Sequence, residues 1–354
     1  MQPTTAERPP AQHASTSPLW NAALPMLALA AVGISIPSVF PIGIVNEAAV
    51  VLLAVGAALG LQMLTGLAGQ LSLGSAALMA VGAFTVGVTS SLAPGIPFVL
   101  LPLWAGIVGA AVGFLVGLPA LRLRGFYLII ATLALHYIVL FVLQRIQESG
   151  PGVVGYIIQR PDLVADDIRW YYVLLVVALA LTVLTAGYKA SATGRAWQMM
   201  AHNEIAAEAI GIDIRRMKLQ VFVLSSFLTA LIGGLGAYTI GVVTYESYPL
   251  GLAISYIACI IIAGLGTTAA TWLGAAFVVW IPLWVTRLLG AYGSVQNASL
   301  NAQIGVLIFG ISIIGFMMFA PGGLNALIAT AWRRATSWVR AGRGSARADD
   351  RKTG

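Results

Sequence analysis

The chain has 354 residues, of which 59% are hydrophobic and only 9% are charged. A soluble domain carries roughly 25% charged residues, so this composition excludes a water-soluble globular protein. The net charge of +7 would suggest nucleic-acid binding in a soluble chain, but here the basic residues fall in particular loops and in a tail, where they report on membrane topology. The sequence therefore predicts an all-α, polytopic integral membrane helical bundle with no role in binding nucleic acid.

The first segment, MQPTTAERPPAQHASTS, is rich in Pro, Thr, Ser and Ala. It lacks the basic region followed directly by an apolar core that marks a cleaved signal. We expect three parts in the chain: a disordered cytoplasmic tail at 1–18, a transmembrane domain at 19–331 with a long cytoplasmic loop at 188–218, and a basic cytoplasmic tail at 332–354.

The apolar runs give the number of spans, because a helix needs about 20 residues to cross a hydrocarbon core of about 30 Å. The run 46–91 carries one charge, Glu47, yet a single helix of that length would reach about 69 Å, so it must cross twice. We place the break at 65–70, TGLAGQ, where glycines and a glutamine interrupt the apolar pattern. About ten spans follow: 20–38, 46–64, 71–91, 98–120, 126–144, 170–187, 219–241, 250–264, 268–289 and 301–319.

The basic residues indicate the orientation of these spans. If both termini are cytoplasmic, 15 of the 19 Lys and Arg lie on that side, which is where positive charge collects. The remaining four, Arg145, Arg160, Arg169 and Arg287, lie outside. This bias supports an even number of crossings, and eight crossings with two re-entrant segments would satisfy it equally well.

Motifs for several kinds of catalysis are absent. None of the three lysines ends a G-x-x-x-x-G-K-[ST] loop, no H-E-x-x-H or C-x-x-C occurs, and Cys259 is the only cysteine. The sequence therefore predicts no nucleotide-binding loop and no metal site. His136 is the one ionisable group deep inside a span; we expect its ring to be satisfied by a neighbouring helix, which makes an intramembrane enzyme a remote hypothesis.

The interruption of the second apolar helix favours a substrate pathway there. A broken helix exposes backbone groups that need partners, and such breaks often line substrate sites. Neutral amide, hydroxyl and backbone groups can contact a polar solute without holding it tightly. The candidates for the substrate pathway are Gly69, Gln70, Ser72 and Ser75. Helix packing, which explains most glycines in such a chain, stays an equal alternative.

Residues 202–212, HNEIAAEAIGI, predict a short amphipathic helix within the long cytoplasmic loop. Glu204 and Glu208 are four apart and share a face, Asn203 could cap the start, and Gly211 suits the end. Apolar surface comes from Ile205, Ala206, Ala209, Ile210 and Ile212. Apolar groups on a helix outside the lipid favour docking on a partner, against the alternative of a solvated loop.

Several segments, in order, carry a family resemblance. They are LTGLAGQLSLGSAALMAVGAFTVG, LPALRLRGFYLIIATLALHYIVL, GRAWQMMAHNEIAAEAIGIDIRRMKLQVFVLSSFLTALIGGLGA, IIAGLGTTAATWLGAAFVV and FAPGGLNAL. Together they resemble bacterial branched-chain amino acid ABC transporter permeases of the M type, from about 46 to 325. The resemblance implies a multi-pass subunit of the bacterial inner membrane that imports branched-chain amino acids by alternating access. It also implies a homologous second permease, two cytoplasmic ATPase subunits that bind ATP and Mg²⁺, and an external solute-binding protein. No cofactor is then expected on this chain.

In importers of this type a cytoplasmic helix carries Glu-Ala-Ala, three residues and Gly, and inserts into the ATPase. Here Ala206 and Ala207 stand three residues before Gly211, but Ile205 precedes them and Glu204 lies one place earlier. The residues that the resemblance assigns to ATPase coupling are Asn203, Glu204, Ile205, Ala206, Ala207, Glu208 and Gly211.

Two departures bear on the substrate. Many relatives have histidine after SLG, where this chain has Ser75, and the external loop lacks a Gly-Gly-x-x-Gly pattern. Leucine, isoleucine and valine lead as cargo, with urea, short amides or other small polar solutes as the alternative. A secondary transporter that needs no ATPase is a further hypothesis.

Overall fold

A computed structural model describes residues 18–93, 95–121, 123, 125–292, 298–319 and 323–324. The long helices are α1 (Pro18–Val39), α2 (Ile42–Leu61), α3 (Ser75–Leu92), α4 (Leu100–Ala120), α5 (Phe126–Ser149), α6 (Asp167–Ala190), α7 (Ala192–His202), α9 (Ile214–Ile240), α10 (Leu250–Ala263), α11 (Thr271–Tyr292) and α12 (Ala298–Phe319). The short elements are the π-helix η1 (Gln62–Leu67), α8 (Glu204–Ala209), the 3-10 helices η2 (Gly152–Val154), η3 (Asp162–Val164) and η4 (Tyr245–Ser247), and the strands β1 (Tyr156–Ile157) and β2 (Val242–Val243).

The all-helical membrane bundle predicted from composition is confirmed, and each of the ten predicted spans falls on a helix. Within the described residues, eight helices are long and apolar enough to cross a membrane. The first and last helices, α1 and α12, contribute shorter apolar stretches, Met26–Val39 and Gln303–Phe316. The predicted tails at 1–18 and 332–354 lie outside the described residues, apart from the first residue of α1.

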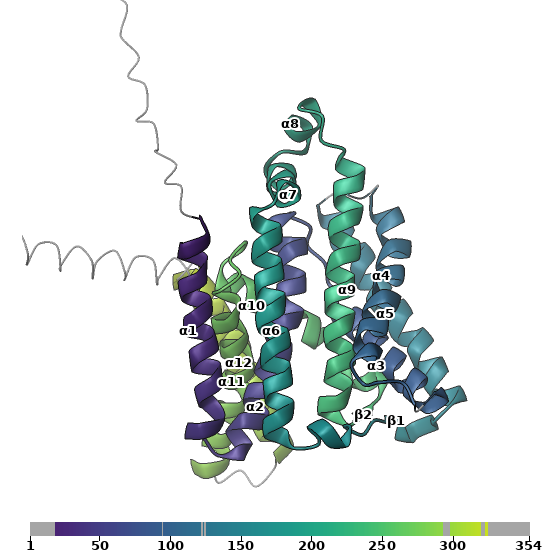
Figure 1. Ribbon diagram of the computed structural model, residues 1–354, viewed down its shortest axis with the longest axis vertical. Helices are drawn as coiled ribbons and strands as arrows, with labels where there is room; N and C mark the ends of the chain where they lie inside the picture. Colours follow the sequence, from purple (N-terminus) through teal and green to yellow (C-terminus); the bar gives the residue numbers. More distant parts are fainter. Residues whose placement is uncertain are drawn as a thin grey trace, which may run out of the picture.

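The core of the bundle is formed by α2 and α9 (Figure 1). Helix α2 packs against α6, α9 and α11, and α9 packs against α2, α3 and α4. Of the membrane-spanning stretch of α9, 83% is buried, against 22% for α5, which lies at the edge of the bundle. The exposed apolar surface of α5 is therefore suited to contact with lipid. The buried share of each helix distinguishes the core helix α9 from the peripheral helix α5.

Small residues let the core helices touch at the backbone. A Cβ added at Gly82 of α3 would meet the carbonyl of Ala230 in α9, and one added at Gly233 would meet the backbone of Met79. Dispersion contacts, which drive helix association in lipid, require this close approach. Close packing therefore explains Gly233 and Gly234 in the stretch IGGLGAYTIG, whereas Gly241 ends α9 with φ +80° and has nothing within 4 Å of an added Cβ.

The two ends of the bundle differ in charge and in structure. Helices α7 and α8 project from one end of the bundle, and the antiparallel β1–β2 pair lies at the other end (Figure 1). Lys189, Arg215 and Lys218 belong to the end that carries α7 and α8. The positive-inside rule assigns the α7–α8 end to the cytoplasm.

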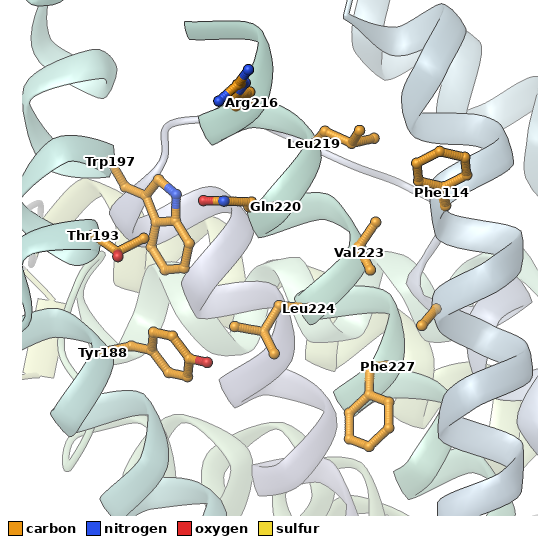
Figure 2. A pocket seen from close by; sticks show the side chains of 11 residues that line it. Phe114, Tyr188, Thr193, Trp197, Arg216, Leu219, Gln220, Val223, Leu224 and Phe227 are labelled. Carbon is orange, nitrogen blue, oxygen red and sulfur yellow. The ribbon is translucent and has the colours of Figure 1, made fainter. Parts of the chain in front are cut away.

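A cavity of about 730 Å³ opens near the cytoplasmic end, between α4, the α6–α7 corner and α9. It exists because α6 packs on α2 and α1, whereas α9 packs on α2, α3 and α4. Figure 2 shows side chains from the two sides facing this space.

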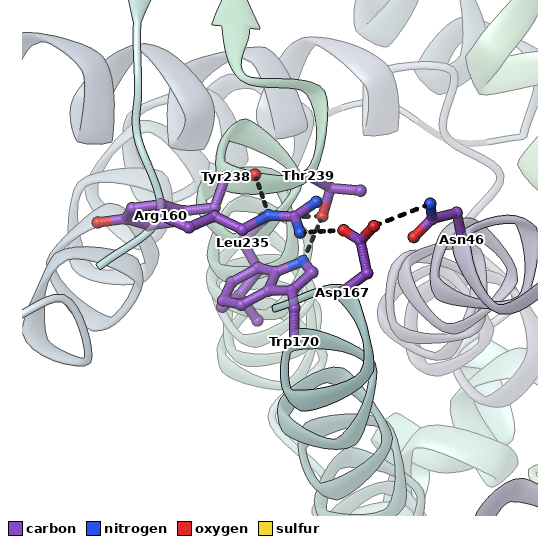
Figure 3. Close-up of polar contacts among 7 residues, drawn as sticks. All are labelled: Asn46, Arg160, Asp167, Trp170, Leu235, Tyr238 and Thr239. Atoms are coloured by element: carbon purple, nitrogen blue, oxygen red, sulfur yellow. Dashed lines mark hydrogen bonds and ion pairs between the residues drawn. The ribbon is translucent and has the colours of Figure 1, made fainter. Parts of the chain in front are cut away.

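A polar cluster fastens the outer end. Arg160 donates to Asp167 over 2.6 Å and to the carbonyl of Tyr238 over 3.0 Å, and Asn46 donates to Asp167 over 3.2 Å (Figure 3). The guanidinium of Arg160 also lies 5.5 Å from the ring centroid of Trp170. The cluster ties the loop before α6 to the first turns of α2 and to the last turns of α9.

Candidate functional site

Helix α8 lies where the sequence predicts a cytoplasmic helix, and its ends are closed by the expected residues. Asn203 Oδ1 accepts hydrogen bonds from the backbone N–H groups of Ile205 and Ala206, over 3.0 and 3.1 Å. At the other end Gly211 has φ +88°, and the N–H groups of Gly211 and Ile212 donate to Glu208 and Ala207. A six-residue helix is marginal alone, so these two caps define it.

The faces of α8 are sharply divided. Ala207 is fully buried, whereas Ile205 is 76% exposed and Ile210, just past the helix, is 62% exposed. Ala206 and Glu208 are exposed as well. Two large apolar side chains thus face water at the cytoplasmic end, where no lipid covers them.

Glu204 joins α8 to the membrane core. Its Oε1 lies 2.5 Å from the Nζ of Lys218, which is only 7% exposed and belongs to the first turns of α9. A charge this buried needs a partner. The pair therefore holds α8 against α9, and it gives Glu204 a definite contact despite the departure from the family pattern.

The helix break lies three to four positions later in the chain than the sequence suggests. The apolar helix continues as η1 to Leu67, and an irregular segment at 68–74, which we call the break segment, precedes α3 at Ser75. The predicted third span therefore begins at Ser75 and not at Leu71. Thr65 Oγ1 donates to the carbonyl of Gln70 over 3.0 Å, and Thr132 of α5 accepts from the N–H of Leu73 over 3.0 Å.

Two of the predicted pathway residues face the cytoplasmic end. Gly69 has φ +68°, and a Cβ added there would lie 3.1 Å from the Cβ of Ala201 in α7. Gln70 is buried, and its Nε2 has no hydrogen-bond partner among the described residues.

The other two lie deeper, beside α5. Ser72 Oγ accepts from the N–H of Gly74, whereas the buried Oγ of Ser75 has no partner in the described part of the chain. His136 is fully buried in α5, and neither of its ring nitrogens has a partner there either. The expectation that a neighbouring helix satisfies this ring is wrong, because its buried surroundings supply packing but no hydrogen bond.

One cavity joins the two predicted sites, which are more than 130 positions apart in sequence. It measures about 410 Å³ and is lined by Gly69 and Gln70 from the break segment, Asn203 and Glu204 from the α8 region, and Lys218 from α9. Ser72 and Ser75 do not line it. The sequence analysis missed Lys218 and Ala201 as site residues, although the position of Lys218 at the start of an apolar span was a signal for a buried, paired charge.

The turn between α10 and α11 packs directly on η1. Gln62 of η1 donates from Nε2 to the carbonyls of Gly264 and Thr267, over 2.9 and 2.8 Å, in the turn between α10 and α11. Gly66 and Gly266 approach at the backbone. The side-chain amide of Gln62 thus adds a donor to two carbonyls that also accept hydrogen bonds from the hydroxyls of Thr267 and Thr271.

The site contains contacts between helices, such as the Glu204–Lys218 ion pair, and neutral polar groups, such as the amide of Gln70. Among the described residues, no group of three His, Cys, Asp or Glu side chains is placed to hold a metal ion.

Comparison with known proteins identifies the family. Residues 43–320 match the model of the branched-chain amino acid transport system permease component. The chain belongs to this family of permeases.

Curated relatives agree with this assignment. The permease is 31% identical over 285 residues to the high-affinity branched-chain amino acid transport system permease protein LivM of Salmonella typhimurium, covering 72% of this chain and 66% of that protein. It is 30% identical to LivM of Escherichia coli with the same coverage, and 24% identical over 238 residues to a probable LivM of Methanocaldococcus jannaschii, covering 64% and 67%. The match thus spans just under two thirds of the first two relatives. No solved structure matches the chain significantly.

Proposed function

We propose that this chain is a permease subunit of an ATP-driven importer for branched-chain or related small amino acids in a bacterial inner membrane. Family membership supports the permease role, and the names of the relatives favour this substrate class. Two cytoplasmic ATPase subunits would bind ATP and Mg²⁺, and a homologous second permease and an external solute-binding protein would complete the transporter.

The observation that carries the coupling part of this proposal is the position of α8. It presents exposed Ile205 and Ile210 toward the cytoplasm and is bound to α9 by the Glu204–Lys218 pair. Exposed apolar groups on a capped helix suit insertion into a cleft on another protein. A partner that pushes α8 therefore also pushes α9.

Movement of α8 has two routes into the bundle. The first is the ion pair to α9, the most deeply buried spanning helix, which packs on α2, α3 and α4. The second runs from α7, which adjoins α8, to the break segment, because Ala201 packs on Gly69. Both routes meet at the 410 Å³ cavity, so one displacement can shift a core helix and the break segment together.

The break segment and the first residue of α3 supply groups for a zwitterionic cargo. Gln70 Nε2 can donate a hydrogen bond, and Ser75 Oγ can donate or accept one. An unpaired buried polar group costs about 1–3 kcal/mol, which contact with a passing solute would offset. Neutral groups also release an amino acid more readily than fixed charges do.

Reconstitution tests the proposed function. Proteoliposomes that contain the whole transporter, with ATPases, second permease and solute-binding protein from the same source, should accumulate radiolabelled leucine only with ATP. The isolated chain should accumulate none. Uphill uptake by the isolated chain would contradict the proposal and favour a secondary transporter, and ATP-driven uptake of urea but not of leucine would overturn the substrate class.

A further inference from the structure

The cavity between α4, the α6–α7 corner and α9 is separate from the coupling site and shares none of its lining residues. The polar groups of Thr193, Trp197, Arg216 and Gln220 lie toward its cytoplasmic end, whereas Leu224 and Phe227 line the deeper, apolar part. Figure 2 shows Trp197 on one wall and Gln220 and Arg216 on the other. The cavity is thus amphipathic along the axis of the bundle.

A buried donor at the polar end has no acceptor. Trp197 is 1% exposed, its ring stacks on Tyr188 with centroids 5.8 Å apart, and its Nε1 has no hydrogen-bond partner among the described residues. Buried polar groups are nearly always satisfied, so such a donor calls for an acceptor from outside the chain. The indole nitrogen belongs to the wall that faces Gln220 (Figure 2).

The neighbouring side chains also carry donors, and the amide of Gln220 and the hydroxyl of Thr193 can accept hydrogen bonds as well. Arg216 pairs with Asp213 through its Nε over 3.0 Å, and the guanidinium carries further N–H donors on its terminal nitrogens. Gln220 adds an amide, and Thr193 a hydroxyl. An anionic oxygen group, such as a phosphate, is the acceptor that this set fits best.

The apolar part of the cavity continues toward the outer leaflet. A second cavity of about 610 Å³ lies between the same three helices, lined by Val176 of α6, Leu103 of α4 and Leu231 of α9, among other apolar residues. On α9 the residues facing the two cavities recur every three or four positions, from Arg216 through Gln220 and Phe227 to Leu235, and so form one stripe about 28 Å long. A polar end that can hold a headgroup, followed by an apolar groove long enough for an acyl chain, matches the shape of a lipid.

We infer that this groove binds a phospholipid of the cytoplasmic leaflet, with its phosphate at Trp197, Gln220 and Arg216 and an acyl chain along Leu224 and Phe227. The polar end lies on the side that the positive-inside rule assigns to the cytoplasm, at the depth of the first turns of α9. A helix of a second permease fits less well, because it would have to bring an acceptor to a buried indole N–H and cover an arginine.

The bound lipid would lie beside the helices that take part in coupling. Trp197 is in α7, which adjoins α8, and Arg216 is two residues before Lys218. The inference does not rest on the proposed function, because it concerns a groove in the chain alone.

Native mass spectrometry of the detergent-purified full chain tests the inference with three probes: dioleoylphosphatidylglycerol, dioleoylglycerol and glycerol 3-phosphate. The first should bind with one tightly held copy, and the other two, which lack either the phosphate or the acyl chains, should bind at least tenfold more weakly. Equal retention of the two lipids would contradict a phosphate contact. Equal binding of glycerol 3-phosphate would show a site for free phosphate esters and would overturn the lipid.

Variants locate the contact. Trp197→Phe keeps an aromatic ring on Tyr188 but removes the N–H, and Arg216→Gln removes the charge; each should weaken phosphatidylglycerol binding about tenfold, since a hydrogen bond to a charged group contributes roughly 1.5–3 kcal/mol. Arg215→Gln is the matched control, because Arg215 lines a different cavity, near Glu208. If both variants bind like the control, or if the assembled transporter holds no lipid and Gln220→Cys crosslinks to the second permease, the inference is wrong.

Discussion

At the scale of single residues, the contact between Glu204 and Lys218 explains how a surface helix can act on a buried one. Lys218 lies among apolar neighbours, where a lone ammonium would be costly. The partially exposed Glu204 supplies the counter-charge and brings α8 with it. Under the proposed function, this ion pair links α8 to α9, and substitutions can break it and restore it.

Lys218→Gln should lower ATP-driven uptake about tenfold while the protein still inserts, because breaking the pair costs about 1–2 kcal/mol of attachment after allowing for the exposure of Glu204. The double variant Glu204→Lys with Lys218→Glu restores opposite charges and should recover most of the uptake. Arg169→Gln, at an exposed position in the first turn of α6 at the opposite end of the bundle, is the control. Failure of the exchanged pair to outperform the single variant in proteoliposome uptake would count against a coupling role for this contact.

Gly69 is a second residue with a specific steric reason for its identity. Its φ of +68° disfavours any side chain by about 1–2 kcal/mol, and a Cβ there would press on Ala201. Gly69→Ala should therefore reduce uptake several-fold and lower the melting temperature. Gly187→Ala, at a helical position with nothing within 4 Å of the added Cβ, should change neither. An unchanged transport rate in Gly69→Ala would show that the α7 contact carries no motion.

At the scale of elements, α8 depends on its ends more than on its length. Asn203 caps the start through two hydrogen bonds, so Asn203→Ala should destabilise the helix by about 1 kcal/mol. Hydrogen exchange of peptides spanning α8 should then rise about fivefold. Ser191→Ala removes the corresponding cap of α7 and should leave α8 protection unaltered. Equal exchange in both variants would mean that α8 does not form independently.

Gly211→Pro tests the other end of α8. Proline removes the Gly211 N–H that donates to Glu208 and cannot adopt φ +88°. Transport should be abolished although the protein inserts normally, as judged by membrane fractionation. Unchanged uptake would contradict the coupling role of the helix.

The elements also show how far sequence patterns reach. The ten apolar stretches and the caps at Asn203 and Gly211 follow from local rules of length, polarity and backbone preference, and each has its counterpart in the structure. The end of the break was misjudged because Leu71 and Leu73 read as membrane-spanning residues although they lie in irregular backbone. Helix α7 was not anticipated, since ATGRAWQMMAH carries a glycine and mixed polarity.

Contacts between distant segments could not be read from the sequence. Nothing local indicates that Ala201 packs on Gly69, or that Glu204 pairs with a lysine fourteen positions away on another helix. Both depend on how α7, α9 and the break segment pack together. The same holds for His136, whose lack of a hydrogen-bond partner among the described residues reflects the side chains around it and not its own helix.

At the scale of the whole molecule, the two ends of the bundle serve different needs. The outer end is fixed by the Arg160–Asp167 contact and its hydrogen bonds to α2 and α9. The cytoplasmic end contains the break segment, the cavity of about 410 Å³ beside it and the projecting helix α8. Under the proposed function, a push on α8 would enter at the cytoplasmic end, and the polar cluster at the outer end would act as the fixed point of the motion.

The central claim is that this force enters through the exposed face of α8, and the most direct measurement is co-purification of the ATPase subunits with permease variants. Ile205→Asp places a charge on the apolar docking surface and should reduce ATPase recovery at least tenfold, with loss of uptake. Val153→Asp, 97% exposed at the opposite end, should retain the ATPases fully. Full recovery of the ATPases and normal uptake with Ile205→Asp would contradict the account.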